Sequence, residues 1–138
     1  MIPIVSVIGK DKEAKTAAVT SLVGELKRRG YRVGTIKHHA HGDFSFDVPG
    51  KASYRHGEAG AIETAVSGPT MMGYVRRHDR ELSLTEVTEF FSQNIDVIVT
   101  EGYLSEETPK VTAPVSDIAE TVDEIESIIK KVKGDGRE

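Results

Sequence analysis

Hydrophobic residues in this chain gather in short runs that are typical of strands in a buried sheet. The runs at 2–8, 31–37 and 96–100 are apolar or rich in β-branched residues, so we expect each to form a strand of a parallel sheet. A weaker run at 110–115 predicts one more strand. Polar or glycine residues border these runs and mark where each strand ends.

Between these runs, apolar residues recur at the spacing of a helix face. The stripe that begins at Ala17 predicts a helix that ends near Gly30, and 51–60 predicts a short helix interrupted by glycine. Ser83 and Thr121 each begin a capping box that precedes an apolar stripe. Two further helices are therefore expected, one after each capping box.

Segments 61–66 and 70–76 predict strands on either side of the turn cluster Ser67-Gly68-Pro69, and we expect them to pair as a hairpin. In the rest of the chain strands and helices alternate. This pattern indicates a three-layer α/β domain with a mostly parallel sheet. We expect a single domain over 1–138, with a frayed tail at 133–138.

Composition narrows the class of protein. A chain of 138 residues, 38% hydrophobic and 29% charged, can form a core. The absence of cysteine excludes disulfides, thiolate zinc sites and a cysteine nucleophile. A net charge of −4 disfavours broad nucleic-acid binding. With no run of about 20 apolar residues and no signal-peptide pattern, we expect a cytoplasmic protein without a membrane partner.

The segment at 9–16, GKDKEAKT, lies between a predicted strand and a predicted helix, as a phosphate-binding loop does. It matches the pattern G-x-x-x-x-G-K-[ST] at Gly9, Lys15 and Thr16. In such a loop, backbone N–H groups surround a phosphate, the lysine contacts the outer phosphates and the hydroxyl binds Mg²⁺. Ala14 replaces the second glycine, and we expect its methyl group to crowd the phosphate or the turn. The intervening positions are charged: Lys10, Asp11, Lys12 and Glu13.

The alternative interpretation of 9–16 is an ordinary strand–helix connection that happens to contain Lys-Thr. Glu101 bears on this choice, because it follows the predicted strand 96–100 at the edge where open parallel sheets bind ligands. Alone, Glu101 is better explained as an acidic residue of a surface loop. Together with the 9–16 segment, it favours a magnesium site formed by Thr16 and Glu101.

Two other polar segments lack a specific signature. His38, His39 and His41 could ligate a metal, but no pair has the i, i+4 spacing of a helical site. We therefore expect solvated histidines or phosphate contacts rather than structural zinc. The turn at 47–53, DVPGKAS, suits an anion in a generic way.

Taken together, these segments resemble the MobB family, molybdopterin-guanine dinucleotide biosynthesis protein B. The resemblance covers most of 2–110, and the block from 37 to 61 is its most specific part, because a generic phosphate-loop protein has no reason to contain it. The chain departs from the family pattern at Ala14 and Ala52, and its region after Lys110 is short. The matching segments, in family order, are 9–16, 37–38, 47–53, 58–61, 101–103 and 109–110.

The resemblance implies a P-loop NTPase-like fold, commonly homodimeric, that binds GTP with Mg²⁺ and is at most a weak GTPase. It also implies a role beside the molybdenum cofactor guanylyltransferase (MobA-like) that joins GMP to molybdopterin. By the same resemblance, Thr16 and Glu101 are the metal residues, and the turn at 47–53 faces molybdopterin or the partner enzyme. The implied ligand-binding residues are Gly9, Lys10, Asp11, Lys12, Glu13, Ala14, Lys15, Thr16, Lys37, His38, Asp47, Gly50, Lys51, Ser53, Glu101 and Gly102.

Two other functions stay open at this point. A small P-loop kinase needs positive charge over the phosphates, which Arg76, Arg77 and Arg80 could supply, although no insertion of lid length is evident. A non-catalytic binding module that has lost nucleotide affinity would explain Ala14. The guanine-reading pattern Asn/Thr-Lys-x-Asp is absent, so the preference for guanine rests on the resemblance alone.

Overall fold

A computed structural model of the protein describes residues 1–40, 42, 45 and 47–135. The chain divides into two compact units: Met1–His39 with Leu84–Glu138 forms unit 1, and Ala40–Ser83 forms unit 2. The expectation of one domain over 1–138 stays a prediction. The chain is helical as far as Asp135, and the rest of the expected frayed tail lies outside the described residues.

Unit 1 contains a parallel sheet of four strands: β1 (Ile4–Ile8), β2 (Val33–Lys37), β5 (Val97–Glu101) and β6 (Lys110–Thr112). Their order in the sheet is β2-β5-β1-β6, and each neighbouring pair is parallel. The predicted α/β fold with a mostly parallel sheet is therefore confirmed.

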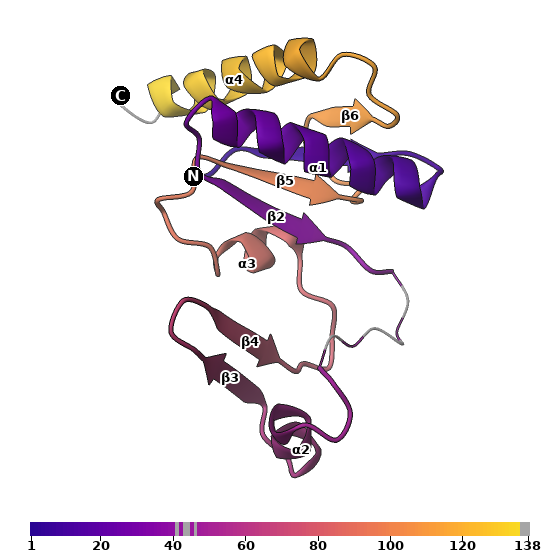
Figure 1. Ribbon diagram of the computed structural model, residues 1–138, viewed down its shortest axis with the longest axis vertical. Coiled ribbons are helices and arrows are strands. Elements are labelled where there is room, and N and C mark those ends of the chain that lie inside the picture. Colours follow the sequence, from indigo (N-terminus) through magenta and orange to yellow (C-terminus); the bar gives the residue numbers. More distant parts are fainter. Residues whose placement is uncertain (41, 43–44, 46, 136–138) are drawn as a thin grey trace. The chain divides into compact units, whose positions relative to one another are not determined.

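Helices α1 (Lys12–Arg28) and α4 (Ile118–Asp135) lie side by side over one face of this sheet (Figure 1). Alternate residues of β1 and β5 point toward the two helices, as side chains on successive strand positions must. Among the described residues, no helix is both long and apolar enough to cross a membrane. The core buried between the helices and the sheet consists of Val5, Val7, Ala18, Leu22, Leu26, Val97, Val99, Ala113, Val122, Ile125 and Ile129.

The second face of the sheet is covered near Gly34 by the segment that follows the short helix α3 (Leu84–Thr88). A Cβ atom at Gly34 would lie 2.7 Å from the ring of Phe91, so the ring packs directly against the strand backbone. Gly34 is in register with Ile98, which belongs to the face opposite α1. The unit thus has three layers, as predicted.

Helices α1 and α4 begin earlier than their apolar stripes predict. Helix α1 begins at Lys12 rather than near Ala17, and the Asp11 carboxylate caps it by accepting the Glu13 N–H at 3.2 Å. Helix α4 begins before the capping box at Thr121, and the Asp117 carboxylate accepts the Glu120 N–H at 3.0 Å. The first turn of a helix is often polar, so a hydrophobic stripe does not show where the helix begins. An N-cap residue marks that start directly.

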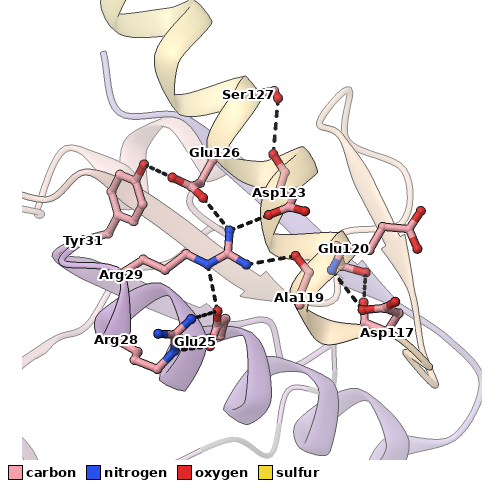
Figure 2. A network of polar contacts seen from close by, with 11 residues as sticks. Glu25, Arg28, Arg29, Tyr31, Asp117, Ala119, Glu120, Asp123, Glu126 and Ser127 are labelled. Carbon is pink, nitrogen blue, oxygen red and sulfur yellow. Dashed lines mark hydrogen bonds and ion pairs between the residues drawn. The ribbon is translucent and has the colours of Figure 1, made fainter.

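Arg29 joins α1 to α4 through several carboxylates (Figure 2). Its guanidinium bonds Glu25 at 2.7 Å on its own helix, and Asp123 at 2.7 Å together with Glu126 on α4. The Tyr31 hydroxyl also donates to Glu126, at 2.6 Å. The Arg29 side chain is only 17% exposed, so this planar cation is held in one position between the helices.

Unit 2 contains helix α2 (Ala52–Glu58) and the antiparallel pair β3 (Glu63–Ser67) and β4 (Met72–Arg76). Both the short helix and the predicted hairpin are confirmed, and Ala65 lies opposite Tyr74. Large apolar side chains remain exposed over this hairpin: Ile62, Val66, Met71, Met72 and Tyr74.

Candidate functional site

Glu101 lies at the carboxyl end of β5, on the sheet face that α1 covers. Val97 and Val99 belong to the core beneath α1, and strand alternation puts Glu101 on that same face. Lys37 ends β2 directly beside it in register. Two parallel strands and α1 therefore converge at the carboxyl edge of the sheet, where ligands of open α/β sheets bind.

The Glu101 carboxylate accepts a hydrogen bond on each oxygen. The Thr16 hydroxyl donates to Oε1 at 2.8 Å, and the Lys37 ammonium donates to Oε2 at 2.9 Å. The Glu101 side chain is 10% exposed, whereas the Lys37 side chain is 52% exposed. Thus a nearly buried carboxylate is held between a hydroxyl of α1 and a cation that reaches solvent.

Burial alone would raise the pKa of Glu101, because it disfavours the charged form. The hydrogen bonds from Lys37 and Thr16, with the positive charges of Lys37 and Lys15, outweigh that cost and hold the pKa below its ordinary value. Glu101 is therefore ionised at neutral pH. A carboxylate and a hydroxyl are hard oxygen ligands of the kind Mg²⁺ prefers, so Thr16 and Glu101 fit the predicted metal.

Much of the segment predicted to bind phosphate, 9–16, is helical. Only Lys10 and Asp11 separate Gly9 from α1, and the residues from Lys12 to Thr16 are already helical. The Lys15 N–H donates to the Asp11 carbonyl at 3.1 Å. The helix expected from Ala17 thus begins at Lys12, because Asp11 caps it there.

At this helix N-terminus, the Asp11 carboxylate lies at the end of α1. It accepts the Glu13 N–H, a group that helix N-termini offer to anions. Lys15 lies beside Gly9, since its Cγ would be 3.4 Å from a Cβ built there. The turn therefore places Lys15 beside Gly9, and the Asp11 carboxylate lies at the N-terminus of α1.

Ala14 is part of the hydrophobic packing of unit 1. It lies in the first turn of α1, is partly buried and packs against the core cluster. Helical alanine has no conformational penalty, whereas glycine has one. The structure thus gives a packing reason for alanine here, and the expected crowding of a phosphate stays a prediction.

The chain turns sharply after Glu101, with two consecutive residues at positive φ. Gly102 has φ 108° and Tyr103 has φ 68°, which is uncommon for a residue with a side chain. A Cβ at Gly102 would lie 3.2 Å from the Cβ of His38. The rings of His38 and Tyr103 stack with centroids 4.5 Å apart. No spacing in the sequence indicates that these two rings stack, because they follow different strands, β2 and β5.

The predicted turn at 47–53 forms a separate polar cluster in unit 2. The Asp47 carboxylate accepts the Ser53 hydroxyl at 2.8 Å and the Arg77 guanidinium at 3.3 Å. Gly50 has φ 86°, a left-handed conformation that suits glycine. Lys51 precedes α2 and bonds the Val48 carbonyl through its N–H at 3.1 Å. Arg77, which the sequence offered only as charge for a kinase lid, here holds Asp47.

The structure therefore divides the predicted site residues between the two units. Among the described residues, no group of three or more histidine, cysteine, aspartate or glutamate side chains is placed to hold a metal, and His41 lies outside them. Unit 2 contains Asp47, Gly50, Lys51 and Ser53. Unit 1 contains Gly9, Lys10, Asp11, Lys12, Glu13, Ala14, Lys15, Thr16, Lys37, His38, Glu101 and Gly102.

Comparison with known proteins gives matches along most of the chain. The "Molybdopterin-guanine dinucleotide biosynthesis adapter protein" of Haemophilus influenzae is 26% identical over 132 residues, covering 95% of this chain and 74% of that protein. The Escherichia coli protein of that name is 32% identical over 114 residues, and the match covers 80% of this chain and 65% of the E. coli protein. This chain thus spans about two-thirds to three-quarters of the length of these relatives.

Solved structures and a family model agree with these matches. The crystal structure of Bacillus subtilis MobB superposes with a TM-score of 0.66 at 28% identity, covering 92% of this chain and 74% of that one. The MobB homologue of Bacillus stearothermophilus gives a TM-score of 0.60 at 28% identity, and the match covers 80% of this chain and 62% of that one. The model of MobB, molybdopterin guanine dinucleotide synthesis protein B, matches residues 4–131. Because that match takes in nearly the whole chain, the protein belongs to the MobB family.

Proposed function

We propose that this protein is an adapter in the attachment of GMP to molybdopterin, and that unit 1 binds GTP with Mg²⁺ at the edge formed by Thr16, Lys37 and Glu101. The names of the relatives support the adapter role. The nucleotide site is supported chiefly by one observation: an ionised, nearly buried carboxylate bonded to a helix hydroxyl and a lysine at the carboxyl edge of a parallel sheet.

In this proposal each side chain has a defined task. Lys15 binds the outer phosphates, and the Thr16 hydroxyl and the Glu101 carboxylate hold Mg²⁺. Bound magnesium neutralises charge on the phosphate oxygens. Lys37 keeps Glu101 ionised before the nucleotide arrives. Asp11 has to leave the helix N-terminus, since its carboxylate and a phosphate cannot share that position.

The proposed partner is a molybdenum cofactor guanylyltransferase, and we expect the protein to act in the cytoplasm as a homodimer. Exposed apolar side chains on the hairpin of unit 2 support a role in protein contacts, because patches of this kind mark interaction sites. Met71 is 76% exposed and Met72 is 62% exposed. Sedimentation equilibrium of the whole chain measures whether it pairs.

A thermal-shift titration tests the nucleotide site. The full chain is heated with Mg²⁺ and GTP, ATP or no nucleotide. A ligand at one hundred times its dissociation constant adds about 2.7 kcal/mol to the free energy of unfolding, which raises the melting temperature visibly. We expect GTP to give the larger shift, Lys15→Ala to abolish it, and Lys27→Ala, at the other end of α1, to keep it. No shift with either nucleotide contradicts the site, and an equal shift contradicts guanine preference.

A further inference from the structure

The sheet of unit 1 has an open edge at β6. This strand is last in the order β2-β5-β1-β6, and in the described part of the chain no strand pairs with its outer side. The Ala113 N–H donates to the Ile8 carbonyl at 2.8 Å, so Ala113 and, by alternation, Val111 face β1. Lys110 and Thr112 therefore direct their backbone N–H and C=O groups outward, where a further strand would pair.

A groove of about 350 Å³ lies beside this edge. It is lined by β6, by the segment that follows the strand and by the start of α4. Three of its lining residues are acidic and exposed, and their spacing puts them on one side of the helix start: Asp117, Glu120 and Glu124. The open strand edge is therefore bordered by negative charge.

The nearby cations are bonded to other groups. Lys110 also lines the groove, but its ammonium is turned back along the chain and bonds the Thr108 carbonyl at 2.7 Å. Arg29 bonds carboxylates on the side of α4 that faces α1 (Figure 2). Among the residues that the structure describes, neither Glu120 nor Glu124 forms an ion pair. The acidic side of the groove thus keeps its charge for a ligand.

These features fit an extended basic peptide. Outward backbone groups at a sheet edge bind an added strand through main-chain hydrogen bonds. On that strand, every second side chain points to the face on which Val111 packs against the core under the helices. Those side chains meet the acidic groove, which favours lysine or arginine there. A second copy of this chain fits less well, because two β6 edges would bring two acidic grooves together.

We infer that the outer edge of β6 binds an extended segment of a partner protein that carries lysine or arginine at alternate positions. The segment pairs with Lys110 and Thr112 through its backbone, and Glu120 and Glu124 select its basic side chains. The inference goes beyond the proposed function and uses none of the residues of the proposed nucleotide site. The two sites can therefore fail separately.

The first test uses the full wild-type chain and a fluorescent peptide of alternating lysine and threonine. Anisotropy at low salt measures its binding. We expect about tenfold tighter binding than for the same peptide with glutamate in place of lysine, because like charges repel at the groove. These peptides carry no phosphate, so a failed GTP titration does not affect the result. No binding of the lysine peptide, or equal binding of both peptides, overturns the inference.

Two N-methylated versions of the lysine peptide distinguish strand pairing from attraction between charges alone. Methyl groups on the lysine nitrogens block one backbone edge of the extended peptide, and those on the threonine nitrogens block the other. Strand pairing predicts that one version loses about tenfold in affinity and the other keeps it. Loss in the lysine version indicates a parallel strand, and loss in the threonine version an antiparallel one. Equal effects of the two modifications overturn the inference.

Thr112→Pro tests the edge from the side of the protein. The Thr112 N–H faces outward, so proline removes a donor for the added strand and leaves the ladder to β1 intact. We expect about fivefold weaker binding of the lysine peptide, from the loss of one hydrogen bond. Thr112→Val keeps the N–H and should bind as wild type. Unchanged binding in a folded Thr112→Pro overturns the inference, and the wild-type peptide comparison decides if the variant does not fold.

Charge variants test the selection for basic side chains. Glu120→Gln with Glu124→Gln should weaken the lysine peptide about threefold, because exposed ion pairs are individually weak. Glu89→Gln with Glu107→Gln removes the same net charge at exposed positions of unit 1 outside the groove and should have no effect. Equal losses in the two double variants overturn the assignment to this groove.

Sedimentation equilibrium tests the other occupant of the edge, a second copy of the chain. We expect wild type and Thr112→Pro to have the same oligomeric state. Self-association of wild type that Thr112→Pro abolishes would show that a second copy covers β6, and would overturn the inference of a partner segment.

Discussion

The hydroxyl of Thr16 donates a 2.8 Å hydrogen bond to the carboxylate of Glu101, although the two residues are 85 positions apart in the chain. This bond joins the first turns of α1 to the end of β5. Lys37 completes the group from the neighbouring strand. The contact explains how a nearly buried glutamate stays ionised at the carboxyl edge of the sheet, and the binding predictions for unit 1 depend on it.

Replacing Asp11 by asparagine should strengthen binding of a phosphate-bearing ligand. Asparagine caps a helix about as well as aspartate, so the free energy of unfolding should change by less than about 1 kcal/mol. The substitution removes a negative charge from the helix N-terminus, where the Asp11 carboxylate now lies. Calorimetric titration with GTP and Mg²⁺ measures the effect, and an affinity equal to or weaker than wild type would show that Asp11 does not compete.

Ala14→Gly tests the packing role of Ala14, which stands where the phosphate-loop pattern has a glycine. We expect the free energy of unfolding to fall by about 1 kcal/mol, because glycine disfavours helix and the partly buried methyl group is lost from the core. GTP affinity should stay within about twofold of wild type. Chemical denaturation and calorimetry give both quantities. Clearly tighter GTP binding would instead support the expectation that the methyl group crowds a phosphate.

Local pattern predicts the strands better than it predicts the site. The apolar β-branched runs that became β1 and β5 are buried in the sheet, so hydrophobicity marks them clearly. The strand order β2-β5-β1-β6 comes from long-range packing, which short-range pattern does not contain. The predicted start of α1 is too late because its first turn is mostly polar, although Asp11 is a cap signal.

The same limit applies to individual contacts. Glu101 and Thr16 were paired by their positions at a strand end and a helix start, which topology brings together. Arg29 lies beside the predicted helix end at Gly30, and its guanidinium bonds Glu126 on α4, almost one hundred residues away. No sequence spacing indicates that partner, because the contact arises only when α1 and α4 pack together in the folded chain.

Glu25 gives the protein a sensitivity to acid. Hydrogen bonds from Arg28 and Arg29 lower the pKa of Glu25 to about 2, from an ordinary value of 4.5. A carboxyl group with a lowered pKa in the folded state stabilises the fold above its ordinary pKa and loses that effect as pH falls toward its folded value. Glu25→Gln should therefore be less stable at neutral pH and lose less stability between pH 4.5 and 2.

Urea unfolding of Glu25→Gln at several pH values measures this slope. Glu89→Gln, at an exposed position on unit 1, is the control and should follow wild type. An acid slope in Glu25→Gln as steep as that of wild type would show that the bonds to Arg28 and Arg29 do not control it.

Two glycines within helices allow a matched test of the Arg77 position. A Cβ at Gly24 meets nothing within 4 Å, so Gly24→Ala should raise the free energy of unfolding by about 1 kcal/mol. A Cβ at Gly57 would meet the Arg77 guanidinium, so Gly57→Ala should forfeit that gain. Chemical denaturation of the two variants measures the difference. Equal stabilisation by the two alanines would mean that Arg77 moves freely.

The Glu101 carboxylate is proposed to hold Mg²⁺ for a bound nucleotide. Calorimetry measures GTP binding with Mg²⁺ and with a chelator, for wild type, for Glu101→Gln and for the exposed control Glu107→Gln. We expect Mg²⁺ to tighten GTP binding to wild type and to Glu107→Gln by tenfold or more, about 1.4 kcal/mol, and Glu101→Gln to lose this gain. A gain from Mg²⁺ of wild-type size in Glu101→Gln would show that Glu101 does not hold the metal.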